Sequence, residues 1–135
     1  MKVELDGRAL TTTEVVAVAR GGEPVALAEA GRDAMAKTAA VVAELADSDE
    51  PVYGVSTGFG SLVDKRIPAD KREELQRALL RSHAAGMGPP IETEVVRAMM
   101  LLRAATLSRG YSGARPEVAE QICALLNAGI TPVVP

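Results

Sequence analysis

A glycine-rich loop is the strongest candidate for a ligand-binding segment. It reads Tyr-Gly-Val-Ser-Thr-Gly-Phe-Gly over residues 53–60. Closely spaced glycines let a backbone turn sharply and come close to a ligand. The loop is not a phosphate-binding P-loop, because Ser61 and Leu62 follow Gly60 where Lys and Ser/Thr would be needed. It also lacks the spacing of a dinucleotide-binding fingerprint. The same residues fit a tight structural turn with Tyr53 packed in a core, so the loop alone leaves both interpretations open.

The single histidine, His83, is the second candidate. It follows Leu79 by four residues and Leu80 by three, so it borders the apolar face of a helix. A lone histidine there is more often a buried structural residue than a catalyst. It cannot build a zinc site without further ligands, and Cys123 is the only cysteine. The neighbouring Ser82 does not indicate a catalytic triad, since successive helical residues point about 100° apart.

The surrounding residues predict a mainly α fold. Four long helices are expected near residues 28–47, 70–86, 93–109 and 115–128, from their caps and apolar stripes. The break before Pro51 ends the first of them, because the residue before proline disfavours helix. The stripe of that first helix consists of Met35, Ala39, Val42 and Ala46.

The N-terminal residues predict a smaller unit. Residues 2–5 alternate polar and apolar before a turn, which indicates a short strand, alone or in a hairpin. Thr11 and Glu14 have the spacing of a capping box. A short helix should therefore begin at Thr11 and end near Gly21.

The expected helix at 93–109 is apolar on most sides, apart from Glu94, Arg97 and Arg103. Such a helix must be covered by other protein, and the remaining short helices offer too little cover. We therefore expect the chain to pack against protein outside this sequence. Three methionines are expected to fill the core: Met87, Met99 and Met100.

Composition excludes several classes of protein. The 135 residues are 47% apolar and 24% charged, which is typical of a folded domain. The net charge is −3 and only three aromatic residues occur, so no nucleic-acid partner is expected. No apolar run approaches the roughly 20 residues that span a bilayer. The charged N-terminus does not look like a signal peptide, and a cytoplasmic location is expected.

Four segments together resemble the aromatic amino acid ammonia-lyase family. Residues 53–60 resemble its tyrosine loop, and Ser-His-Ala-Ala-Gly at 82–86 resembles the selectivity segment of its histidine branch. Residues 107–113 and 126–135 resemble later family segments, in the right order. The resemblance covers nearly the whole chain and is strongest from Pro51 onward. It implies the helical N-terminal part of the ammonia-lyase (fumarase/aspartase-like) fold, with residues 1–135 forming an incomplete N-terminal region.

The resemblance also implies a reaction. The family removes ammonia from an α-amino acid with a methylidene-imidazolone electrophile, which forms from an Ala-Ser-Gly tripeptide; no metal is implied. Tyr53 corresponds to its general base, although a phenol with a pKa of roughly 10 would need help to act near neutrality. His83 corresponds to the contact with the substrate side chain, flanked by Ala84, and Gly60 to a glycine whose backbone lies against the substrate.

The substrate implied is histidine, with urocanate as product. A polar contact rejects a purely apolar ring, and phenylalanine lyases usually carry an apolar residue in place of His83. Tyrosine lyases and tyrosine aminomutases can also carry this histidine, so tyrosine remains an alternative.

One departure from the family concerns length. No Ala-Ser-Gly occurs up to Pro135, so this chain alone is expected to be inactive. Three interpretations stay open: part of a full-length lyase, the small subunit of a split lyase or aminomutase, or a non-catalytic remnant that binds another protein. The first two imply the rest of the lyase, or a partner subunit, as partner and a homotetrameric assembly.

Overall fold

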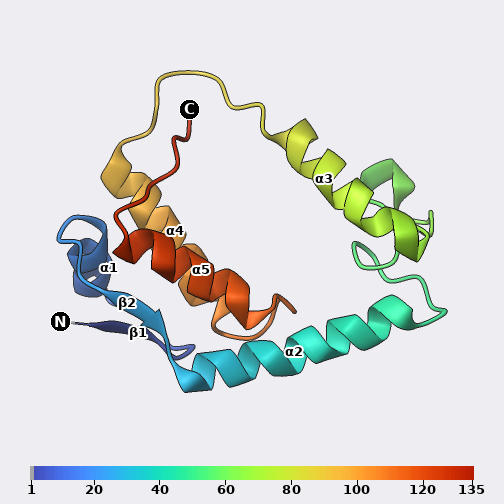
Figure 1. Cartoon of the computed structure of the whole chain (residues 1–135), viewed down its shortest axis with the longest axis horizontal. Helices are drawn as coiled ribbons and strands as arrows, with labels where there is room; N and C mark the ends of the chain where they lie inside the picture. The colour runs from blue at the N-terminus through green and yellow to red at the C-terminus, as the bar shows by residue number, and fades with distance from the viewer. Residues whose placement is uncertain (1) are drawn as a thin grey trace. The chain divides into compact units, whose positions relative to one another are not determined.

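The computed structural model describes residues 2–135, and helices dominate it (Figure 1). The mainly α prediction is confirmed. The helices are α1 (Thr12–Ala19), α2 (Glu29–Asp47), α3 (Arg72–His83), α4 (Thr93–Leu107) and α5 (Pro116–Asn127), the strands are β1 (Val3–Leu5) and β2 (Val25–Leu27), and two short 3-10 helices are η1 (Gly60–Leu62) and η2 (Ala69–Lys71). None of the helices in this described part is long and apolar enough to cross a membrane.

Three of the four long helices begin and end within two residues of the predicted positions. The exception is the predicted helix 70–86. Asp70 and Glu73 have the spacing of a capping box, but Asp70 lies inside η2 and no side chain caps α3. At the other end, Ala84 leaves the helical conformation and α3 stops at His83.

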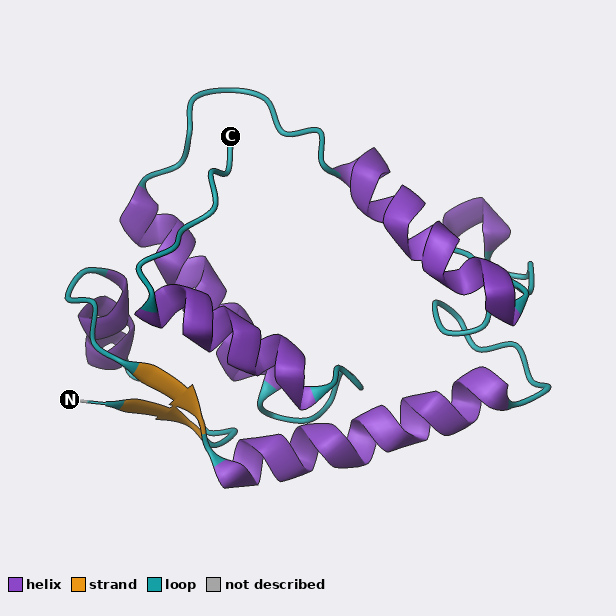
Figure 2. Ribbon diagram, in the orientation of Figure 1, coloured by secondary structure: helices purple, strands orange, loops and turns teal. Residues whose placement is uncertain are grey.

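The predicted N-terminal strand is present, but the hairpin alternative is wrong. β1 pairs in parallel with β2, with Val3 opposite Val25 and Leu5 opposite Leu27 (Figure 2). Parallel neighbours need a crossover connection, and here α1 provides it. The strand β2 was not predicted, because its three residues are all apolar and show no alternation of polar and apolar side chains.

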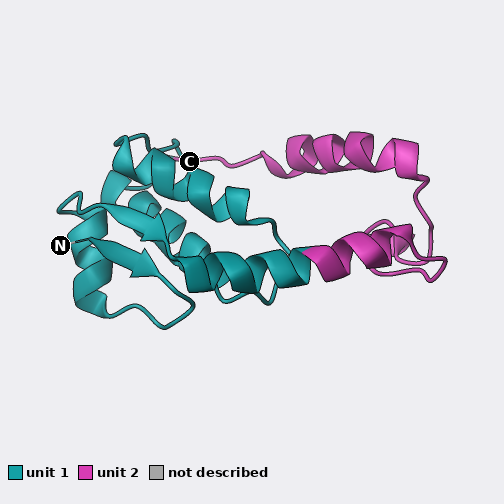
Figure 3. Ribbon diagram, turned by 60° about the horizontal axis from the view of Figure 1, so that its bottom comes forward, with its two compact units in different colours: residues 1–39, 89–135 teal, residues 40–88 magenta. Residues whose placement is uncertain are grey.

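The chain divides into two compact units (Figure 3). Unit 1 comprises residues 1–39 and 89–135, and unit 2 comprises residues 40–88. The core of unit 1 is formed by the two strands with α1, α4 and α5. Its buried residues are Val3, Leu5, Val18, Val25, Leu101, Ala104, Ala105, Cys123 and Leu126.

Unit 1 depends on one close approach in the segment that follows α4. Gly110 has a φ of 69°, a left-handed conformation that favours glycine. A Cβ atom at Gly110 would lie 2.6 Å from the backbone carbonyl of Ala34 in α2. Glycine is therefore required here so that the segment after α4 can pass directly over α2.

Arg97 differs from its predicted place on a polar side of α4. It is buried, and its guanidinium donates to the carbonyls of Val18 (3.0 Å), Ala19 (3.1 Å) and Leu126 (3.2 Å). These carbonyls lie at the C-terminal ends of α1 and α5, where helices have unpaired acceptors and partial negative charge. The buried charge is thus stabilised by two helix ends.

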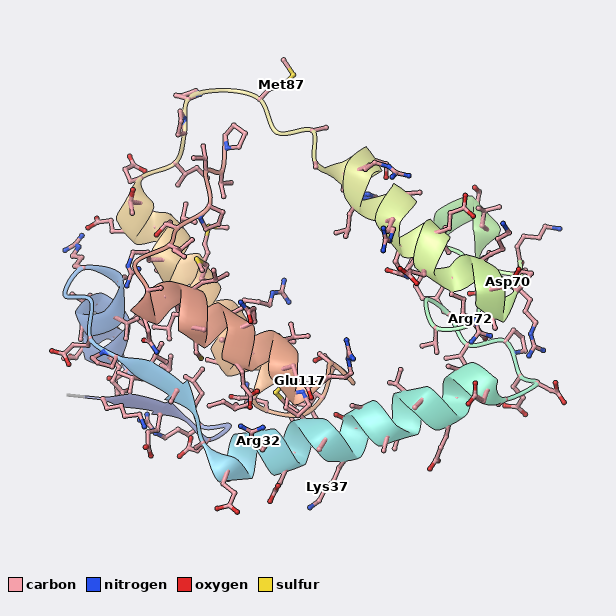
Figure 4. The ribbon with its side chains drawn as sticks, in the orientation of Figure 1. Arg32, Lys37, Asp70, Arg72, Met87 and Glu117 are labelled. Carbon is pink, nitrogen blue, oxygen red and sulfur yellow. The ribbon has the colours of Figure 1, made fainter. Side chains whose placement is uncertain are left out.

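The prediction that three methionines fill the core is wrong for two of them. Met87 is 92% exposed and projects away from the chain (Figure 4), and Met99 is 50% exposed. Val95 and Leu102 of α4 are also exposed. A cavity of about 590 Å³ opens beside Met99 and Leu102, lined by residues of α4, Ile122 of α5 and the C-terminal segment. α4 therefore keeps an apolar side that the described residues of unit 1 leave uncovered.

Candidate functional site

The glycine-rich loop begins with a tight turn. The Val52 carbonyl accepts hydrogen bonds from the backbone N–H groups of Val55 (3.1 Å) and Ser56 (3.0 Å). The Ser56 hydroxyl in turn accepts from the N–H of Val52 at 2.9 Å. Ser56 and Thr57 are fully buried, so the polar residues of the loop hold its shape rather than face a ligand.

The second half of the loop is closed by backbone pairing. Thr57 and Arg66 form an antiparallel bridge, flanked by hydrogen bonds from Gly58 to Lys65 (3.0 Å) and from Ile67 to Ser56 (2.9 Å). The Arg66 guanidinium also donates to the carbonyls of Ser48 and Asp49, each at 2.8 Å. The loop is thereby fastened to the segment that follows α2.

Tyr53 lies on the surface of this loop with 60% of its area exposed. Its ring packs edge-on against Phe59, with ring centres 5.8 Å apart. Gly54 has a φ of 72°, and a Cβ there would lie 3.1 Å from the Phe59 ring. The interpretation as a tight turn is confirmed, whereas the interpretation of Tyr53 as a core residue is wrong. The phenol is presented outward by a rigid support.

Gly60 begins η1 with a φ of 57°. The space where its Cβ would point is open, with no heavy atom within 4 Å. Its backbone is therefore accessible, which a glycine lying against a substrate requires.

His83 is the last residue of α3 and is exposed, so its interpretation as a buried structural residue is wrong. Its Nδ1 lies 2.9 Å from the carbonyl oxygen of Leu79 and 3.0 Å from the hydroxyl oxygen of Ser82. The Ser82 hydroxyl also lies 2.8 Å from the Leu79 oxygen. Ala84 follows as the C-cap, donating to Leu80 at 3.0 Å.

Tyr53 and His83 both belong to unit 2, but Tyr53 precedes α3 in the sequence and His83 is the last residue of that helix. A helix of 12 residues is about 18 Å long. Within residues 2–135 no hydrogen bond or ring contact joins the two side chains. The cavity beside α4, and a second of about 380 Å³ lined by Arg66 and Arg72, contain none of the four predicted site residues. The chain therefore presents these groups without enclosing them.

Cys123 is the other side chain that could act as a nucleophile. Burial in the core of unit 1, and secondarily the charge of Glu120, raise the pKa of its thiol to about 11. A thiolate is the reactive form, so Cys123 is not activated for chemistry at neutral pH.

The sequence profile of the family described as aromatic amino acid lyase matches residues 10–135. The chain belongs to this family. A histidine ammonia-lyase of Streptomyces griseus is 55% identical over 124 residues, which is 92% of this chain and 24% of the relative. Among solved structures, the chain matches the tyrosine aminomutase of Streptomyces globisporus with a TM-score of 0.93 and 35% identity, and the histidine ammonia-lyase of Trypanosoma cruzi with 0.89 and 34%; each match covers all of this chain and 26% of the other.

The predicted resemblance and the fold that it implied are thus confirmed. This aromatic amino acid lyase chain spans about a quarter of the length of the curated relatives it matches. Sequence reasoning did not find the roles of Ser56, Arg66 and Ser82. For Ser82 a signal was available, because serine three residues after a helical residue often hydrogen-bonds back to its carbonyl.

Proposed function

We propose that this chain forms part of an ammonia-lyase that converts L-histidine to urocanate, and that it contributes Tyr53 as the base. The observation that carries the proposal is the 55% identity with a relative named histidine ammonia-lyase, over 92% of this chain. The outward display of Tyr53 on a rigid loop supports it, since a base must reach the substrate.

In the proposed reaction, the Tyr53 oxygen acts as the base and takes a proton from the β-carbon of the substrate. The electron pair of that C–H bond forms the carbon–carbon double bond, the C–N bond breaks, and ammonia leaves. The methylidene-imidazolone of the family would supply the electrophile. The tripeptide that forms it does not occur among these 135 residues, so this chain's contribution is limited to proton removal and substrate contact.

His83 would contact the substrate side chain, with Ala84 beside it, and the Gly60 backbone would lie against the substrate. A polar side chain at position 83 selects for rings with polar atoms, because an apolar ring would leave the imidazole unpaired. The exposure of His83 and the open space around Gly60 support these roles.

The complete site would need protein beyond these residues, because Tyr53 and His83 are both exposed and neither lines the two cavities described above. We propose the remaining part of the lyase, or a larger partner subunit, as that protein, in a cytoplasmic homotetramer. The interpretation as a non-catalytic remnant stays as the contrary case. Tyrosine as substrate, with lyase or aminomutase chemistry, is a second candidate supported by the 35% identity with a tyrosine aminomutase.

The test is made in the complete enzyme with Tyr53→Phe, which removes only the hydroxyl. We expect kcat to fall by roughly 10²–10⁴-fold, as is typical of a lost general base. Tyr111→Phe is the matched control, because Tyr111 is also exposed, and it should leave kcat unchanged. Unchanged turnover in Tyr53→Phe would remove the proposed role of the loop.

A second variant tests the substrate. His83→Leu should weaken the use of histidine relative to phenylalanine, measured as the ratio of the two kcat/KM values. Product analysis with histidine and tyrosine distinguishes the two candidates: urocanate supports the first, whereas coumarate or β-tyrosine supports the second.

A further inference from the structure

Three atoms at the end of α3 form a closed set of contacts. The Leu79 carbonyl oxygen, the Ser82 hydroxyl oxygen and the His83 Nδ1 lie 2.8, 2.9 and 3.0 Å from one another. The arrangement follows from helix geometry, because residues three and four positions after Leu79 can both turn back to its carbonyl. Ser82 and His83 therefore meet although they are neighbours in sequence.

These contacts decide where the imidazole proton lies. A carbonyl oxygen can only accept, so the contact between Nδ1 and Leu79 is attractive only if Nδ1 carries a hydrogen. That hydrogen can be shared with the Ser82 oxygen, while the Ser82 hydroxyl donates to Leu79. All three contacts are then satisfied. With the proton on Nε2, the Ser82 hydroxyl could satisfy only one contact, and lone pairs would face each other at the Nδ1–Leu79 contact.

We infer that Ser82 and the Leu79 carbonyl hold the proton of neutral His83 on Nδ1, so that Nε2 offers a lone pair to the substrate side chain. Ser82 is then a positioning residue, which acts through His83. The hydrogen bonds made by one ring nitrogen determine whether the other nitrogen carries the proton. The part of this inference that concerns substrate rests on the proposed function, whereas the part that concerns the tautomer does not.

The consequence is a preference for side chains that donate a hydrogen bond. An imidazole N–H or a phenol O–H can pair with a lone pair on Nε2. A pyridine ring carries only an acceptor. The nitrogen lone pair of pyridylalanine would therefore face the lone pair on Nε2, with no hydrogen between them. The site should therefore reject pyridylalanine, although it is polar and similar in size to tyrosine.

The tautomer can be measured directly, because His83 is the only histidine in the chain. Labelling with ¹⁵N-histidine gives one pair of ring signals, whose shifts distinguish a protonated from a bare nitrogen. Magic-angle spinning records them whether the chain is monomeric or associated. In the 135-residue chain above the ring's titration we expect hydrogen on Nδ1, in contrast to free histidine, which favours Nε2. Ring signals that show the proton mainly on Nε2, as in free histidine, would overturn the inference.

Two variants test Ser82 itself. Ser82→Ala should raise the ratio of Nε2–H to Nδ1–H by roughly two- to tenfold, the factor for losing one ordinary hydrogen bond. Ser82→Thr keeps a hydroxyl that can bond back to the same carbonyl and should restore the original ratio. Ser112→Ala, at another exposed serine, is the control. An unchanged ratio in Ser82→Ala, at equal helix content by circular dichroism, would show that Ser82 does not position His83.

The kinetics of the complete enzyme provide an independent test. Ser82→Ala should raise kcat/KM for 4-pyridylalanine relative to tyrosine by the same two- to tenfold, mainly through KM. A constant ratio would contradict the link from tautomer to substrate choice. If Tyr53→Phe leaves kcat unchanged but the Nδ1–H signal is present, the lyase role is removed and the tautomer assignment still holds. The two proposals can therefore fail separately.

Discussion

The side chain of Asn127 forms two hydrogen bonds with the backbone of Val25. Its Nδ2 donates to the Val25 carbonyl at 2.8 Å, and its Oδ1 accepts from the Val25 N–H at 2.9 Å. Asn127 is the last residue of α5, and Val25 begins β2. The amide thus pairs with the strand as another strand would, and it fixes the end of α5 against the sheet of unit 1.

The first prediction concerns this amide. Asn127→Asp keeps the acceptor but places a carboxylate oxygen against the Val25 carbonyl, so we expect the free energy of unfolding to fall by about 1–3 kcal/mol at pH 7. At low pH the protonated acid can donate again, and the loss should shrink. Gln121→Glu makes the same chemical change at an exposed position of α5. It should change the free energy of unfolding by no more than about 0.5 kcal/mol. Urea unfolding followed by circular dichroism measures both, and equal effects would contradict the prediction.

The second prediction concerns Arg97. A lysine at this position cannot reach three carbonyls on two helices with one ammonium group. Arg97→Lys should therefore lose at least one hydrogen bond to a charged group, at a cost of about 1.5–3 kcal/mol of unfolding free energy. Arg103→Lys, at an exposed position of α4, is the matched control. If both variants unfold at the same urea concentration, the buried contacts of Arg97 do not stabilise the fold.

The third prediction concerns pH. Hydrogen bonds from Arg8, then from the backbone and side chain of Thr11, lower the pKa of Glu14 from 4.5 to about 2. A carboxyl with a lowered folded-state pKa stabilises the fold above its unfolded value and loses that contribution as the pH falls through the folded value. Stability should thus decline between about pH 4.5 and pH 2. Glu14→Gln should flatten this part of the profile, measured by thermal unfolding; an identical slope in both proteins would refute the assignment.

The fourth prediction concerns the uncovered apolar side of α4. Met99 and Leu102 are about half exposed beside a cavity that is largely apolar. Exposed apolar patches favour association, so the 135-residue chain should self-associate in sedimentation experiments at micromolar concentration. The double variant Met99→Lys with Leu102→Lys should shift it toward monomer, whereas Val41→Lys in α2 should not. A wild-type monomer with a sharp cooperative unfolding transition would count against this prediction.

Features that depend on neighbours along the chain could be predicted from the sequence. The capping box forms as expected, with Thr11 accepting from the Glu14 N–H at 3.3 Å and Glu14 accepting from the Thr11 N–H at 2.8 Å. Pro116 occupies the first turn of α5, as its fixed φ favours. These signals were sufficient because both partners of each interaction lie within one helical turn. Residue type and immediate context also singled out Tyr53 and His83, but their proposed roles came from the resemblance to the lyase family.

Features that join distant residues were decided only by the tertiary structure. β2 forms because Val25 pairs with Val3, and α1 separates these two residues in the sequence. The buried Arg97 is satisfied by hydrogen bonds to the carbonyls of Ala19 and Leu126. The glycine-rich loop is likewise closed by the pairing of Thr57 with Arg66, nine positions further along the chain. Such partners are separated by many residues, and no local pattern records them. Their pairing is set by which polar groups can be satisfied once the apolar surfaces have packed together.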